Sequence, residues 1–129
     1  MKFQLNLLVA WFWIMFGFLS GMLLGMFFHQ ENWLGGYGSF RRRLYRLGHI
    51  SFFGLGALNL LFFLTAQYAP VTDRSLLTLA SWLFAVGAFS MPVCCLVMAH
   101  CPKLRLIFVL PVSSLIGGGA ITLLEATKL

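Results

Sequence analysis

Acidic residues are scarce in this chain: its 129 residues include only three, Glu31, Asp73 and Glu125, against nine Lys and Arg. Charged residues make up 9% of the sequence, whereas soluble domains carry about 25%. With so few carboxylates, catalysis by a carboxylate pair is nearly excluded. The sequence also lacks a Ser-His-Asp spacing, an HExxH motif, a P-loop and a CxxC motif, and we therefore expect a protein that is not an enzyme.

Cysteine is also scarce, with three in the chain. Cys94 and Cys95 are adjacent within an apolar stretch, and on a helix their side chains would point about 100° apart. This spacing does not indicate a disulfide framework of the kind found in small secreted domains.

Long apolar runs are what the chain does contain, since 60% of its residues are hydrophobic. Four uncharged blocks stand out, at residues 5–28, 50–69, 75–99 and 106–124. A helix needs roughly 20 such residues to cross the hydrocarbon core. Four short segments could not close a barrel, so each block is predicted to be a helix. We therefore predict an all-α membrane protein, with residues 1–129 forming a single transmembrane domain.

The first block is longer than the apolar region of a signal peptide, roughly 7–15 residues. No small-residue cleavage site follows it, and we expect a retained helix. The second and third connections, at 70–74 and 101–105, are short. Short connections favour antiparallel neighbours, so the predicted architecture is an up-down four-helix bundle.

The first connection is longer and is predicted to contain a helix of its own at about 40–47. Ser39 would be its N-cap, and Gly48 would follow its last residue. Phe40, Leu44 and Leu47 would share one face, with arginines on the rest. This pattern indicates a short amphipathic helix on the cytoplasmic surface of the membrane.

The basic residues predict an orientation. Six of them lie in the first and third connections, and three lie on the other side of the membrane. The positive-inside rule then places both termini outside the cytoplasm, in a bacterial inner membrane. Because the positive residues lie at membrane boundaries, we expect no nucleic-acid partner. The arginines predicted to bind lipid headgroups are Arg41, Arg42, Arg43 and Arg46.

Three histidines, His29, His49 and His100, are predicted to lie at the same membrane boundary. Two of them could hold a haem b between facing helices, with Arg43 and Arg46 binding its propionates. A small metal site is the other liganded interpretation. The simplest interpretation is histidines that lie where headgroups meet water, without a ligand.

Sulfur forms a second candidate site. Met15, Met22 and Met26 fall with His29 within about 60° on the first span. The third span carries a sulfur group that could face them and bind Cu(I), consisting of Met91, Cys94, Cys95, Met98 and Cys101. The alternative is that methionine fills packing gaps and cysteine packs as a small apolar residue.

Small and polar residues predict helix contacts. Gly17, Gly21 and Gly25 would let a second helix approach the first, and Asn59 could hydrogen-bond across an interface. An ion or small-molecule transporter would need a polar cavity around Asn59. No titratable residue lies in the middle of a span, which disfavours transport.

The leading functional hypothesis is a small accessory subunit of a larger membrane complex, with membrane lipids and other transmembrane subunits as partners. It rests on the glycine stripe, the 16% aromatic content and the absence of catalytic groups. By analogy, a respiratory or photosynthetic electron-transfer assembly is the expected host. The alternatives are a protein that binds haem b or copper, and a transporter.

Overall fold

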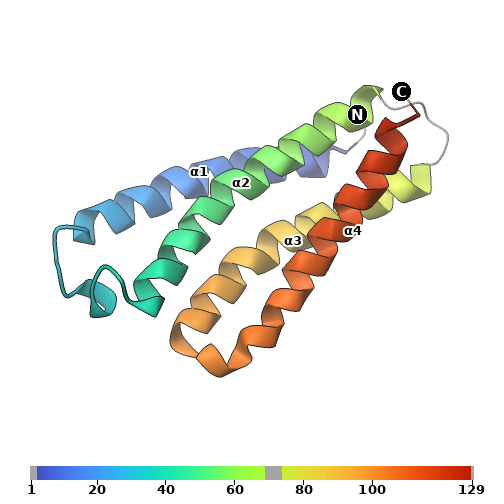
Figure 1. Ribbon diagram of the computed structural model, residues 1–129. Helices are drawn as coiled ribbons and strands as arrows, with labels where there is room; N and C mark the ends of the chain where they lie inside the picture. Colours follow the sequence, from blue (N-terminus) through green and yellow to red (C-terminus); the bar gives the residue numbers. More distant parts are fainter. Residues whose placement is uncertain (1–2, 69–73, 129) are drawn as a thin grey trace.

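The computed structural model describes residues 3–68 and 74–128, which form four long helices and two short 3-10 segments (Figure 1). The long helices are α1 (Gln4–Phe27), α2 (Phe40–Tyr68), α3 (Arg74–His100) and α4 (Val109–Ala126). The 3-10 segments are η1 (Trp33–Gly35) and η2 (Pro102–Phe108). No strand occurs within these two described ranges, as the composition predicts. The last residue of the predicted second span, at position 69, lies outside the described residues.

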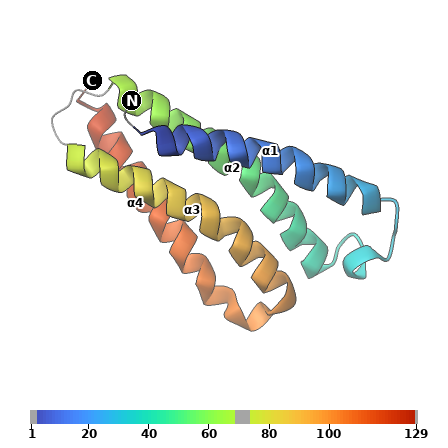
Figure 2. The same ribbon diagram turned by 180° about the vertical axis from the view of Figure 1, so that it is seen from behind.

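Each helix packs against the next one in the chain, and α1 also contacts α3. The start of α1 and the end of α4 lie at the same end of the molecule, together with the end of α2 and the start of α3 (Figure 1). At the opposite end lie the connection between α1 and α2 and the connection between α3 and α4. Toward that end α1 and α3 diverge, as Figure 2 shows.

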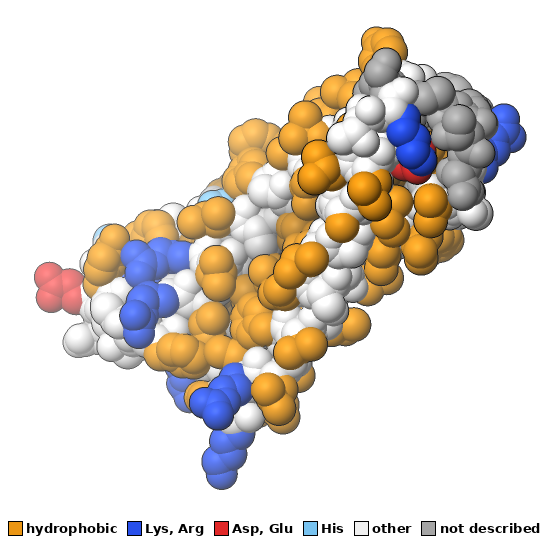
Figure 3. Space-filling model, turned by 45° about the vertical axis from the view of Figure 1, so that its right-hand side comes forward, with side chains coloured by type: hydrophobic (Ala, Val, Ile, Leu, Met, Phe, Trp, Pro, Cys, Tyr) orange, Lys and Arg blue, Asp and Glu red, His pale blue; other side chains and the backbone are white. Residues whose placement is uncertain are grey.

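Four helical stretches are long and apolar enough to cross a membrane: α1, α2, α3, and α4 together with η2. On the face drawn in Figure 3, apolar side chains cover the middle of the molecule, and Lys and Arg side chains lie toward its ends. A soluble protein would not expose so continuous an apolar surface. These features fit a multi-pass integral membrane protein.

The prediction that a separate helix ends before Gly48 is wrong, because α2 continues through this residue to Tyr68. Gly48 is buried against α3, where a Cβ atom would lie 3.5 Å from Cβ of Cys95. Packing against α3 therefore overrides the helix-ending tendency of glycine. Residues 40–47 form the first two turns of α2, and Ser39 Oγ accepts a hydrogen bond from Arg42 N (3.2 Å).

Three buried polar side chains join α1, α2 and α3. Asn6 Nδ2 donates to Asn59 Oδ1 (2.8 Å) and to the Ser81 carbonyl (3.2 Å), while Ser81 Oγ donates to Asn6 Oδ1. Asn59 Nδ2 donates to the Leu55 carbonyl (2.9 Å). Asn6 and Asn59 are fully buried, so these bonds satisfy amides that lipid could not.

Apolar packing continues from this network. Trp13 packs with Val9, Leu55 and Ala88, and its Nε1 donates to the Ala88 carbonyl (3.0 Å). A second buried cluster joins the last turns of α2 to the first turns of α3 and consists of Phe62, Ala66, Leu77, Ala80 and Phe84. Beside the first cluster, α1 and α2 come close together at Gly56, where an added Cβ would lie 3.0 Å from the Ala10 carbonyl oxygen.

Two of the three glycines predicted to mediate helix packing lie against α2, and the third does not. An added Cβ at Gly17 would lie 2.7 Å from the Phe53 ring, and one at Gly21 would lie 2.8 Å from the His49 ring. A Cβ at Gly25 would meet nothing within 4 Å. Gly17 and Gly21 thus accommodate side chains of α2, whereas Gly56 faces the backbone of α1.

Replacing Gly56 by Ala should destabilise the bundle, because the new methyl group would press on Ala10, Trp13 and Ile14. Overpacking of this kind costs about 1–3 kcal/mol. Gly54→Ala is the matched control on the same helix, since its methyl group would meet nothing within 4 Å. The measurement is reversible unfolding in mixed micelles. Equal stability of the two variants would contradict the close contact between α1 and α2.

Candidate functional site: an apolar crevice and a polar pocket at one end of the bundle

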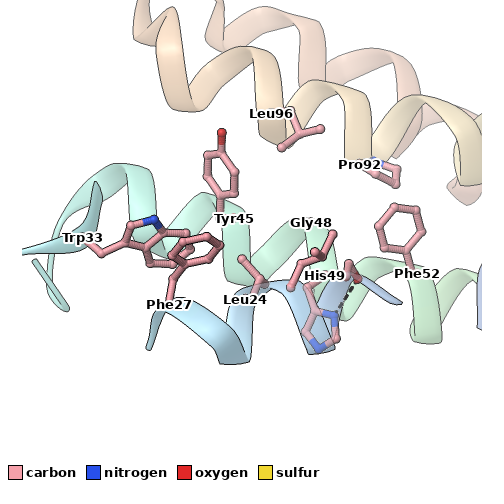
Figure 4. Close-up of a pocket in the computed structure, with 11 residues that line it drawn as sticks. Leu24, Phe27, Trp33, Tyr45, Gly48, His49, Phe52, Pro92 and Leu96 are labelled. Carbon is pink, nitrogen blue, oxygen red and sulfur yellow. Dashed lines mark hydrogen bonds between the residues drawn. The ribbon is translucent and has the colours of Figure 1, made fainter. Parts of the chain in front are cut away.

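An apolar crevice of about 340 Å³ lies between α1, α2 and α3, at the end where α1 and α3 diverge (Figure 4). Pro92 and Leu96 of α3 lie across from residues of α1, α2 and η1. Four aromatic side chains line the crevice: Phe27, Trp33, Tyr45 and Phe52. The volume falls within the range of ligand pockets, roughly 300–1,000 Å³.

Neighbouring residues shape the hollow. Gly48 lines it without a side chain of its own and packs against Cys95 of α3. The wall opposite is built by Trp33, whose ring stacks on Phe27 with centroids 5.4 Å apart and planes 12° apart. Leu23, Phe27 and Leu96 are substantially exposed as well as lining the crevice, so its mouth opens sideways onto the apolar surface.

The predicted histidine site is not assembled, because the three histidines have separate surroundings. His49 Nδ1 is hydrogen-bonded to Ser20 Oγ (2.9 Å), between α1 and α2. His100 Nε2 is hydrogen-bonded to Tyr45 Oη (3.0 Å), and His29 is exposed. Over residues 3–68 and 74–128, no three His, Cys, Asp or Glu side chains are grouped to hold a metal ion.

The predicted copper path also fails to form. Met15, Met22 and Met26 are 54–61% exposed on the outer face of α1. Cys95 is buried toward Gly48 of α2, and Cys94 Sγ donates to the Ile107 carbonyl of η2 (3.5 Å). The two sulfur groups therefore do not face each other. Met98 is half-buried and Cys101 is exposed.

Arg42 was predicted to bind lipid headgroups with its neighbours, but it is buried, with 2% of its surface exposed. Its Nη2 donates to the Phe28 carbonyl (3.1 Å) and its Nη1 to the Gln30 carbonyl (3.4 Å). Its guanidinium also lies 5.2–5.5 Å from three ring centroids, those of Phe28, Trp33 and Tyr37. Arg42 thus fastens the connection between α1 and α2 onto the start of α2.

The other arginines in the first turns of α2 remain at the surface. Arg41 and Arg43 are exposed, and the guanidinium of Arg46 lies 4.6 Å from the centroid of the Tyr37 ring. Arg43 and Arg46, the predicted propionate partners, have no assembled histidine pair beside them. Binding of lipid headgroups by Arg41, Arg43 and Arg46 stays a prediction.

A second pocket, of about 400 Å³, lies beside the crevice and is more polar. Ser39 and Arg41 line it from the start of α2, and His100 and Pro102 line it from the end of α3 and η2. Tyr45 lines the crevice and His100 lines this second pocket, so the hydrogen bond between them lies between the two. We refer to this second pocket, lined by Ser39, Arg41, His100 and Pro102, as the boundary pocket.

Glu125, at the opposite end of the molecule, is a buried carboxyl group with 1% exposure. It forms an ion pair with Lys128 one turn later, and this is the one ion pair within the described parts of the chain. Glu125 lies in the last turn of α4, away from the middle of the helix.

Several residues that line the crevice were not identified from the sequence. Tyr45 precedes His49 by four residues, which places both on one face of a helix, and this spacing could have identified a shared wall. Trp33 lies in a turn-like segment whose path depends on Arg42. Ser20 carries no signal of its own in an apolar span.

Comparison with protein-family models, curated proteins and solved structures gives no match for this chain.

Replacing Arg42 by Leu should loosen residues 28–39, because two backbone carbonyls lose their donor and three aromatic rings lose their cation. We expect amide hydrogen exchange in this segment to quicken by about tenfold or more, since hydrogen bonds from charged groups contribute about 1.5–3 kcal/mol each. Arg43→Leu is the matched control, since Arg43 is exposed. Equal exchange in the two variants would show that Arg42 does not hold the connection.

Proposed function

We propose that this chain is a non-catalytic, multi-pass membrane protein that serves as an accessory subunit of a larger membrane complex. In this proposal the four helices form an up-down bundle across the membrane. The first turns of α2, which are rich in arginine, face the cytoplasm, and both termini lie outside it. The partner is a transmembrane helix of another protein, packed against the outer face of α1. Electron-transfer assemblies are the candidate hosts by analogy.

The observation that carries this proposal is the difference between the exposed faces of α1 and α4. The exposed side chains of α1 include many aromatic and sulfur-containing groups, among them Trp11, Phe12, Met15, Phe18, Met22 and Met26. The large exposed side chains of α4 are aliphatic: Val109, Leu110, Val112, Ile116, Leu123 and Leu124. Both faces are apolar, but their chemistry differs.

This difference matters because lipid tails are as apolar as leucine, so an aliphatic face needs no protein partner. Aromatic residues and methionine are instead enriched where proteins meet. Unbranched methionine also adapts its shape to irregular surfaces. We therefore assign the α1 face to a protein partner and the α4 face to lipid.

The two alternative functions receive less support. A haem or copper protein needs assembled ligands, whereas His49 and His100 are bonded to Ser20 and Tyr45. A transporter that uses Asn59 needs this amide at a polar cavity, whereas Asn59 is fully buried and bonded to Asn6.

Photo-crosslinking in native membranes tests the proposal. A benzophenone side chain placed at Met22, which is 60% exposed, should give a discrete product containing a second protein. The same group at Ile116 of α4, which is 67% exposed, is the matched control and should yield lipid adducts only. Mass spectrometry of the products identifies the partner.

Two results would contradict the accessory-subunit proposal. One is the same lipid-only pattern from both positions. The other is a stable, monomeric protein that purifies from native membranes in mild detergent without any partner.

A further inference from the structure

We propose that the crevice and the boundary pocket together hold one anionic phospholipid. One acyl chain occupies the crevice, and the phosphate lies in the boundary pocket against Arg41 and His100. This inference does not depend on the partner of α1, because it uses the space between α1, α2 and α3.

The crevice fits a hydrocarbon chain. Its lining is almost wholly apolar, and three of its polar side chains are already engaged: His49 is bonded to Ser20, and Tyr45 is bonded to His100. A ligand with many hydrogen-bonding groups would therefore find few partners there and would lose its hydration. A flexible hydrocarbon chain carries no such penalty.

The mouth of the crevice determines how a ligand enters. Leu23, Phe27 and Leu96 line the crevice and are 40–55% exposed on the apolar surface. A molecule from water would have to cross that surface, whereas an acyl chain already lies beside it. The source of the ligand is therefore the surrounding membrane.

The boundary pocket fits an anionic headgroup. It is lined by Arg41, whose guanidinium offers hydrogen-bond donors for phosphate, and by His100, whose Nδ1 is not part of the bond to Tyr45. Ser39 also lines the pocket, but its hydroxyl hydrogen is donated to the Leu34 carbonyl (2.6 Å). Within residues 3–68 and 74–128, Arg41 forms no ion pair, so its charge is available. Five further basic residues lie at this end of the molecule, against the single acid Glu31: Arg42, Arg43 and Arg46 in the first turns of α2, and Lys103 and Arg105 in η2.

The two spaces are placed as the two parts of one lipid molecule require. Tyr45 Oη and His100 Nε2 are 3.0 Å apart, with Tyr45 in the wall of the crevice and His100 in the wall of the boundary pocket. A lipid with its phosphate beside His100 would therefore pass its chain along the Tyr45 ring. Trp33 and Phe27 would then cover the chain from α1 and η1.

Native mass spectrometry of the delipidated full chain in detergent tests this proposal. The probes are palmitoyl-oleoyl phosphatidylglycerol and phosphatidylcholine, which share their acyl chains and differ in net charge. We expect one phosphatidylglycerol to bind about fivefold more tightly than phosphatidylcholine, the effect of about one basic residue near an anionic lipid. Equal binding of both lipids to the wild-type chain would overturn the headgroup assignment.

Substitutions separate the two parts of the site. Arg41→Ala should bring the two lipids to equal affinity, whereas Arg105→Ala, an exposed basic residue of η2 that does not line the boundary pocket, should keep the preference. Leu96→Trp and Leu23→Trp should fill the crevice from α3 and α1 and weaken both lipids by about fivefold or more. Leu106→Trp is the control for these two variants, because Leu106 is 76% exposed and lines neither the crevice nor the boundary pocket.

The two filling variants keep the test decisive if one of them fails to fold, because they reside on different helices. The lipid binding of each variant is compared with that of the wild type only if the two chains have the same unfolding midpoint in detergent. Unchanged lipid binding in a folded filling variant would overturn the assignment of the chain to the crevice.

Discussion

The hydrogen bonds between Asn6, Asn59 and Ser81 are the interaction on which the rest of the bundle depends. In lipid, an amide that is not bonded to protein has no water to replace the lost partner, so each such group constrains the helix that carries it. Asn6 uses both of its amide hydrogens, one on α2 and one on α3. A shift of any of the three helices along its axis would break at least one bond, and the network therefore fixes their register.

The two ends of the molecule are held together in different ways. Near the chain termini, the amide network and the cluster around Phe62 and Phe84 bring three helices into close contact. At the opposite end, Arg42 attaches the first connection to α2, but α1 and α3 separate. The crevice lies where α1 and α3 diverge. The connection between α1 and α2 is held beside it by Arg42, which donates to backbone carbonyls and packs against aromatic rings.

The four helices could be predicted because block length and absence of charge are properties of each segment alone. The role of Asn59 as a polar contact could be predicted, but its partner Asn6 could not, since pairing depends on how two helices are aligned. Gly48 was misinterpreted for a related reason: glycine favours a helix end in isolation, yet here it accommodates Cys95 of α3. Arg42 is equivalent in sequence to Arg41 and Arg43, and only its rotational position on α2 buries it. The histidines share a predicted depth, but the side of the helix each one faces is decided by packing.

The unbroken course of α2 has a geometric consequence. Its 29 residues rise about 43 Å, which exceeds a hydrocarbon core of about 30 Å. Arg41 and Phe52 are separated by eleven residues of that helix, or about 17 Å of rise. If Arg41 lies at the level of lipid phosphates, the inner wall of the crevice reaches roughly the middle of the bilayer. A membrane of different thickness would therefore change the tilt of α2, and with it the depth at which the crevice opens.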